Sequence, residues 1–227
     1  MRLSASDRRQ SLLDAALDLF SRQGYQGTTT RQVADRAGIT EALIFRHFPT
    51  KEDLYWHLLE SRSRLRDVRP KIDRLFADPA LDDEAIFTAI AADILRRNFK
   101  DDTLPRLLLF SALENHKLSD RFYRNNIEPD CELLAKHIQQ RIRDGRFRKV
   151  DPLLAARGFI GMAFYHFMIQ EWFGGKRFQK FEIEHVSQTL ARIWLAGMSR
   201  ELSGTNGTGP SSKKGRAANS PKPRRRT

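Results

Sequence analysis

The spacing of apolar residues predicts helices along the chain. Leu13, Ala16, Leu17 and Phe20 repeat at the i, i+3, i+4 and i+7 positions of one helical face, and Gly24 follows as a C-terminal cap. No stretch of four or more residues shows the convincing alternation of apolar and polar positions that marks a half-buried strand. The pattern therefore predicts an all-α fold of about nine helices.

Proline and glycine residues divide this pattern into segments of helical length. After the first helix, short helices are expected at about 30–37, 41–48 and 51–66, and Pro70 is expected to end the last of these. Longer helices are expected at about 82–100, 103–117, 120–144, 151–173 and 182–202. The increase in length near residue 70 predicts a domain boundary there.

The short helices carry specific capping signals. Thr29 with Gln32 matches a capping box, and Gly38 can adopt the left-handed conformation that ends a helix. Thr40 is placed to cap the next helix, with Ile39 before it as a hydrophobic staple. Thr50 caps a further helix, with Asp53 in the box position. The segment thus predicts a helix, a tight turn, a short helix, a second turn and a long helix.

The short central helix cannot bury all of its large side chains. Ile44 and Phe48 lie one turn apart and face the core, so the outward-facing residues are Glu41, Ala42, Leu43, Arg46 and His47. A short, braced, outward-facing helix fits the DNA major groove. Arg46 and His47 would contact phosphates or guanine, Leu43 a thymine methyl group, and Lys51 a phosphate at a helix N-terminus. The alternative is an ordinary three-helix corner that binds nothing.

A family resemblance supports the first interpretation. Residues 28–58, TTTRQVADRAGITEALIFRHFPTKEDLYWHL, resemble the DNA-binding domain of the tetracycline-repressor (TetR) family of bacterial transcription regulators, and residues 12–29 resemble its first helix and turn. The resemblance implies a cytoplasmic homodimeric repressor that binds double-stranded DNA at a near-palindromic operator. It also implies a helix-turn-helix domain at 1–60 and an effector-binding and dimerisation domain at 61–202, to which the composition adds a basic tail at 203–227.

By position, the resemblance assigns base or phosphate contacts to Thr30, Arg31, Thr40, Glu41, Ala42, Leu43, Phe45, Arg46, His47 and Lys51. Two of these residues depart from the family pattern. Phe45 stands where the family usually has a tyrosine, so a phosphate hydrogen bond is lost. Glu41 stands where a neutral or basic residue is commoner, and it must accept from a cytosine or be repelled by the DNA backbone.

The second domain contains a segment that is apolar nearly all round its helix, Phe159 to Phe173. Gly158, Gly161 and Ala163 would permit close helix approach, which suits a dimer interface. Two interpretations of this segment stay open with equal weight: an ordinary core helix, and one wall of a ligand-binding pocket. For a pocket, the candidate lining residues are Phe110, Leu113, Phe164, His166, Phe167 and Gln170, and the effector would be a small hydrophobic or aromatic molecule.

The net charge of +12 is concentrated in the tail. Residues 203–227 contain seven basic residues and no acid, which leaves +5 for residues 1–202, while eight basic and eight acidic residues cancel within 1–60. The tail has no apolar residue larger than alanine, so disorder is expected. It either supplies sequence-independent attraction to DNA or is inert.

Several classes of function lack sequence support. A single cysteine, Cys131, excludes an intramolecular disulfide framework, and the six histidines show no metal-binding spacing. No nucleophile elbow, P-loop or dinucleotide fingerprint is present, so no enzyme, cofactor or metal is expected. No continuous apolar run approaches a membrane span. The competing function is an architectural or protein-recruiting DNA-binding protein without an effector.

Overall fold

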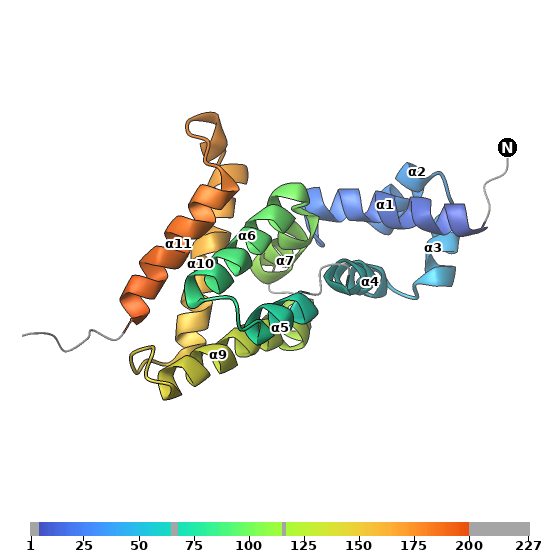
Figure 1. Ribbon diagram of the computed structural model, residues 1–227. Coiled ribbons are helices and arrows are strands. Elements are labelled where there is room, and N and C mark those ends of the chain that lie inside the picture. Colours follow the sequence, from blue (N-terminus) through green and yellow to red (C-terminus); the bar gives the residue numbers. More distant parts are fainter. Residues whose placement is uncertain (1–4, 65–67, 115–116, 200–227) are drawn as a thin grey trace, which may run out of the picture.

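The computed structural model describes residues 5–64, 68–114 and 117–199, and helices dominate these ranges. One isolated antiparallel bridge joins Phe147 to Ser199, and no strand is present in the described residues. The expected all-α fold is confirmed (Figure 1). The helices are α1 (Ala5–Gln23), α2 (Thr30–Ala37), α3 (Glu41–His47), α4 (Lys51–Arg64), α5 (Arg69–Ala77), α6 (Asp83–Lys100), α7 (Thr103–Leu113), α8 (Lys117–Phe122), α9 (Glu128–Arg143), α10 (Pro152–Glu171) and α11 (Ile183–Met198).

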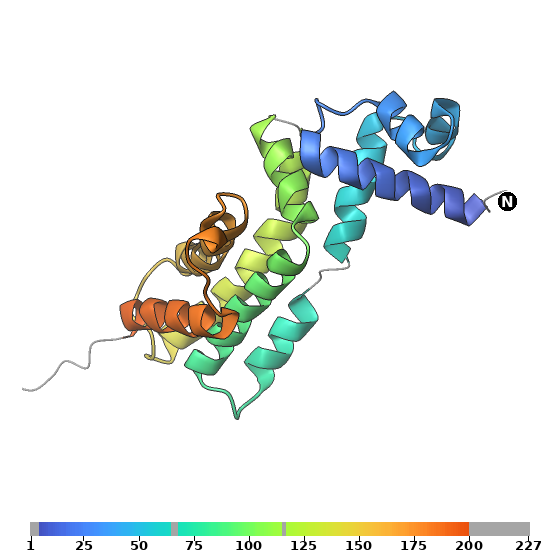
Figure 2. The same cartoon turned by 90° about the horizontal axis from the view of Figure 1, so that it is seen from above.

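The helices form an elongated arrangement with two ends. Helices α1 to α4 lie at one end, α10 and α11 lie at the other, and α6 and α7 run between them (Figures 1 and 2). The tail, 203–227, lies outside the described residues. The first end carries the predicted DNA-contacting residues, and the second carries the segment that is apolar nearly all round.

The first buried cluster joins the two parts of the chain. It contains Phe20, Ile44 and Tyr55 from the N-terminal helices, and it continues into Leu107 of α7 and Phe122 of α8. Burying apolar area in this way is the main favourable term in folding, at roughly 25 cal/mol per Å². The N-terminal helices therefore share their core with α7 and α8.

The second cluster holds α6, α9, α10 and α11 together. Phe87 stacks on Trp194 with ring centroids 4.4 Å apart, and Phe159 meets both rings edge-on, at 4.9 Å from Phe87 and 5.4 Å from Trp194. The bridge from Phe147 to Ser199 ties the end of α11 to the loop before α10. These contacts fix the half of the molecule farthest from α3.

Two helix predictions need correction. Pro70 does not end the preceding helix; it lies in the first turn of α5, a helix that the sequence analysis missed. Proline is tolerated there because the first backbone N–H groups of a helix have no intrahelical partner. The single helix expected at 120–144 is instead α8, a π-helical segment (Tyr123–Ile127) and α9.

Helix α10 corrects the expectation about membrane-length segments. Its 20 residues are apolar enough, by length and composition, to cross a membrane. Tyr165 and His166 interrupt the continuous apolar run, but the mean hydropathy of the whole helix stays high enough despite them. A core or interface helix of a water-soluble protein meets the same test, so this property alone assigns no membrane.

Candidate nucleic-acid interface

The local signals around α2 form as predicted, whereas the side-chain cap expected of Thr40 at α3 does not form. The Thr29 backbone N–H donates to Gln32 Oε1 at 2.8 Å, and the Gln32 N–H donates to Thr29 Oγ1 at 3.2 Å, which completes the capping box. Gly38 adopts φ 65°, the left-handed conformation that ends α2. Thr40 is the N-cap of α3, but its side chain makes no capping hydrogen bond. The turn between α2 and α3 therefore rests mainly on Gly38.

The two faces of α3 are divided as the sequence predicted. Ile44 is fully buried and Phe48, just after the helix, is 6% exposed. Phe45, Arg46 and His47 are exposed, with 44% of the Phe45 residue surface accessible. The helix is thus anchored by one face and presents a cationic, aromatic face to solvent, which is the geometry that major-groove reading needs.

A hydrogen bond joins the starts of α2 and α3. The Thr30 hydroxyl donates to the carboxylate of Glu41. The two residues each occupy the first position of their helix, so this contact fixes the N-terminus of α3 against that of α2. A carboxylate at a helix N-terminus is also favoured by the helix dipole. Glu41 therefore has a structural partner within the protein besides any base.

Lys51 binds inside the protein. Its Nζ donates to the carbonyl oxygens of Tyr25 at 2.7 Å and Thr28 at 2.9 Å, and lies 4.1 Å from the centroid of the Tyr25 ring. Burial lowers the pKa of the Lys51 ammonium, and the nearby charge of Glu114 partly opposes that shift. Two of the three ammonium protons thus hold the α1–α2 turn. The phosphate contact of Lys51 stays a prediction, and it requires the third proton.

The remaining predicted contact residues lie at the starts of α2 and α3. Arg31 and Ala42 are exposed, as is Thr40, while Thr30 and Leu43 are half-buried. Sequence reasoning missed Arg9 of α1, which lies 5.8 Å from the centroid of Phe48. No local signal points to Arg9, because it meets Phe48 only once α1 has packed on the end of α3.

The six predicted ligand-lining residues divide between two helices. Phe110 and Leu113 lie on α7, with Leu113 70% exposed; the other four lie on the C-terminal half of α10. Phe167 and Gln170 are buried, and burial lowers the pKa of His166 below 6.5. Phe164 and Phe167 pack against Trp172 at 6.0 and 5.3 Å. A ligand at these residues stays a prediction.

An apolar cavity lies elsewhere, between α5, α6, α9 and α10. Its volume is about 90 Å³. It is lined by Val68, Lys71, Ile72, Leu75, Ile90, Asp93, Ile94, Arg97, Asp130, Leu134 and Ile160. None of the six predicted lining residues is among these. The charged members form ion pairs: Asp93 binds both Lys71 and Arg97 at 2.7 Å.

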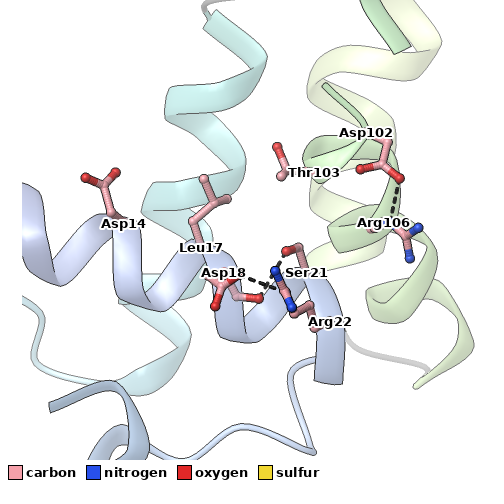
Figure 3. Close-up of a pocket in the computed structure, with 8 residues that line it drawn as sticks. All are labelled: Asp14, Leu17, Asp18, Ser21, Arg22, Asp102, Thr103 and Arg106. Carbon is pink, nitrogen blue, oxygen red and sulfur yellow. Dashed lines mark hydrogen bonds and ion pairs between the residues drawn. The ribbon is translucent and has the colours of Figure 1, made fainter. Parts of the chain in front are cut away.

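A polar cleft of about 540 Å³ lies between α1 and α7. Figure 3 shows Asp18 and Arg22 on one side and Asp102 and Arg106 on the other, each pair joined by an ion pair, at 2.8 Å and 2.5 Å respectively. The Trp172 Nε1–H also donates to Asp102 at 3.0 Å, so the corner before α7 is bound to the end of α10. The charged lining makes this cleft a poor match for a hydrophobic ligand.

The anchored, outward-facing α3 after a tight glycine turn, on an all-helical chain, defines a helix-turn-helix DNA-binding regulator. Residues 12–58 match the family described as bacterial regulatory proteins, tetR family, and residues 86–197 match the AefR-like transcriptional repressor C-terminal domain. The chain belongs to the tetR family of bacterial regulatory proteins.

Individual relatives agree with this assignment. The transcriptional repressor KstR2 of Rhodococcus jostii is 30% identical over 156 residues, covering 67% of this chain and 74% of that protein. The regulator AcrR of Shigella flexneri is 45% identical over 60 residues, which are 25% of this chain and only 28% of the AcrR length. FadR of Bacillus subtilis, solved in complex with stearoyl-CoA, shares the fold with a TM-score of 0.62 at 15% identity, over 83% of this chain and 98% of that one.

Proposed function

We propose that this regulator is a homodimeric, sequence-specific repressor that leaves its operator when a small hydrophobic ligand enters the cavity between α5, α6, α9 and α10. The observation that carries the proposal is the position of α5. This helix walls the cavity, has no buried residue, and follows directly after α4 in the chain. A change at the cavity therefore has a short route to the helix-turn-helix.

The small size of the cavity means that a ligand can enter only if part of the cavity wall moves. At about 90 Å³ it is much smaller than the ~300–1,000 Å³ of typical ligand pockets. A ligand must therefore displace a wall, and α5 is the least buried one. Two ion pairs hold α5 in place: Lys71 with Asp93 of α6 at 2.7 Å, and Arg69 with Asp130 of α9 at 3.7 Å. Ion pairs near the surface contribute little, so displacement of α5 is opposed mainly by the packing of Ile72, Leu75 and Phe76 against the core.

Movement of α5 would reach the DNA-binding helices through α4. Leu54, Tyr55 and Leu59 of α4 are buried in the same cluster as Ile44 of α3. A ligand shifts this equilibrium only through its different affinity for the DNA-bound and released conformations. A coupling of about 1–3 kcal/mol is ordinary for such a switch.

The related structures favour a hydrophobic ligand. The solved FadR contains stearoyl-CoA, which combines a long apolar chain with an anionic group. The cavity here combines apolar side chains with two cations, Lys71 and Arg97, and two carboxylates, Asp93 and Asp130, so its charged groups balance. We propose a ligand with an apolar body; an acidic end would bind here only by replacing Asp93 as the partner of Lys71 or Arg97.

The dimer interface is proposed on α10 and α11. Leu154, Tyr165 and Ile193 are between 60% and 65% exposed on these helices. A Cβ atom added at Gly158 or Gly161 would meet nothing within 4 Å, so an open face of α10 is available for close approach by a second helix. An exposed apolar surface of this kind usually marks an interaction site.

The test is a DNA selection followed by a ligand screen with the full chain. We expect selection from random duplexes to return a near-palindrome, with half-sites about one DNA turn apart, ~34–36 Å or slightly more. Thermal-shift screening of apolar acids should then identify a compound that stabilises the protein and releases that DNA. If the selection returns a near-palindrome but the screen finds no such compound, the alternative of a DNA-binding protein without a ligand is supported. The small size of the cavity is the observation that favours this alternative.

A further inference from the structure

The residue that caps the end of α7 contacts the turn between α1 and α2. Glu114 Oε2 accepts the backbone N–H of Tyr25 at 3.1 Å and that of Gln26 at 3.1 Å. The partners lie 89 and 88 positions apart in the sequence. A carboxylate that accepts two N–H groups makes charge-assisted hydrogen bonds, which are about twice as strong as neutral ones.

The opposite side of the same turn faces a positive charge. Lys51 Nζ binds the carbonyl oxygens of Tyr25 and Thr28, at 2.7 and 2.9 Å. The N–H groups of the turn thus point to a carboxylate from the second domain, and its carbonyl groups point to an ammonium from α4. Each charged side chain matches the backbone dipoles it meets, so the turn is held from both sides.

The close approach of the Glu114 carboxylate to the turn depends on Gly24. A Cβ atom at this position would lie 2.3 Å from Glu114 Oε1 and 2.9 Å from a ring carbon of Phe110, distances that would force a shift. Gly24 also has φ 76°, a conformation that other residues rarely adopt. Phe110 and Glu114 therefore pack directly on bare backbone.

The turn leads without a break to the recognition helix. The Thr28 hydroxyl is buried and donates to the Gly24 carbonyl at 2.9 Å, and Thr29 then caps α2. Thr30 binds Glu41 at the start of α3. A contact at the start of the turn is thereby passed through α2 to the outward-facing helix.

We infer that Glu114 is a positioning residue for DNA binding: together with the Tyr55–Leu107 hydrogen bond and the shared core, it sets the orientation of the helix-turn-helix against α7. Without its carboxylate, the N–H groups of Tyr25 and Gln26 lose their acceptor, while the Lys51 and Thr28 hydrogen bonds remain, and DNA binding must order this side of the turn again. The inference rests on the DNA-binding part of the proposed function and needs neither the ligand nor the dimer.

The first measurement is amide hydrogen exchange in the full chain, which requires no DNA. Glu114→Ala should speed exchange of the Tyr25 and Gln26 amides by about tenfold or more, because a hydrogen bond to a charged acceptor is removed. Glu114→Gln keeps an acceptor oxygen and should retain most of the protection. Glu132→Ala, at an exposed glutamate of α9, is the matched control and should leave both amides unchanged.

The second measurement is affinity for the DNA selected by the wild-type protein, well below the unfolding temperature. Glu114→Ala should weaken binding about tenfold with unchanged base preference, and Glu114→Gln should restore it. A purely stabilising role would lower the melting temperature and leave this affinity alone, which would overturn the inference. The inference is also overturned if the Tyr25 and Gln26 amides of Glu114→Ala exchange at the wild-type rate. The same holds if Glu114→Gln binds DNA as weakly as Glu114→Ala.

The two proposals fail in different ways. A wild-type protein that selects no DNA sequence contradicts the proposed repressor. The exchange rates of Tyr25 and Gln26 decide separately whether Glu114 holds the turn. If Glu114→Ala speeds exchange of these amides but leaves DNA affinity unchanged, the hydrogen bonds of Glu114 are only structural and the positioning role is wrong.

Discussion

Arg46 and Lys51 are close in sequence, yet their side chains have different surroundings. Arg46 lies on the exposed face of α3. Lys51 is half-buried and binds two backbone carbonyls of the α1–α2 turn. A cation that reads bases and a cation that holds a turn should respond differently to removal.

We predict that Arg46→Ala and Lys51→Ala both weaken operator binding but differ in kind. If Arg46 makes a bidentate contact to guanine, its loss should cost about 1–3 kcal/mol and relax the preference at one base pair. Loss of Lys51 should weaken all sequences alike and also lower the free energy of unfolding, since two carbonyls lose their donor.

Binding-site selection with both variants, together with urea denaturation, checks this pair. Identical base preferences for Arg46→Ala and the wild type would contradict the reading role of Arg46. A Lys51→Ala variant with wild-type unfolding free energy would show that the two carbonyl contacts contribute nothing.

At the scale of the element, α10 shows two different surfaces. One face is buried in the core through Phe159, Ala163 and Phe167. On another, Gly158 and Gly161 are exposed, although glycine in a helix interior costs about 1 kcal/mol relative to alanine. Within the protomer nothing requires glycine at either position, because an added Cβ atom meets open space.

We predict that Gly161→Ala stabilises the folded helix while Gly161→Leu breaks the dimer. The larger side chain fits the isolated protomer but would hold a partner helix away. Light scattering at micromolar concentration should report a dimer for the wild type and a monomer for Gly161→Leu. Ala112→Leu, at an exposed position of α7, is the control and should remain dimeric; equal masses for all three proteins would place the interface elsewhere.

At the scale of the whole molecule, charge is distributed unevenly. Residues 1–60, which carry the DNA-reading helix, contain eight basic and eight acidic residues. The segment 203–227, outside the described residues, carries seven basic residues and no acid. Long-range attraction to DNA therefore has a source in the tail and none in the net charge of the DNA-binding end.

We predict that ending the chain at Leu202 flattens the salt dependence of operator binding by a few units of slope. Each phosphate neutralised steepens log K against log salt by about 0.9, and flexible cations carry no base information. Affinity measured from about 50 to 200 mM salt should therefore change in slope while the preferred operator stays the same. Equal slopes for the two proteins would show that the tail is inert.

The sequence by itself determined the local features of the DNA-binding end. The Thr29–Gln32 capping box, the left-handed Gly38 and the buried face of Ile44 and Phe48 were all predicted and are confirmed. Each depends on residues at most four positions apart, so the chemistry that decides it is written within one turn of helix. The family resemblance supported the DNA-reading role inferred for the exposed face, and the family match confirms that class of protein.

Tertiary structure alone decided how the DNA-binding end meets α7. The pairing of Glu114 with Tyr25 and Gln26 spans 88 and 89 positions, and Tyr55 of α4 donates to the carbonyl of Leu107 in α7 at 2.6 Å, 52 positions away. Helical periodicity shows which face of an element is apolar, but not which other element covers it. The cavity beside α5 and the inward turn of Lys51 escaped prediction for that reason: each arises from helices that meet only after the chain has packed.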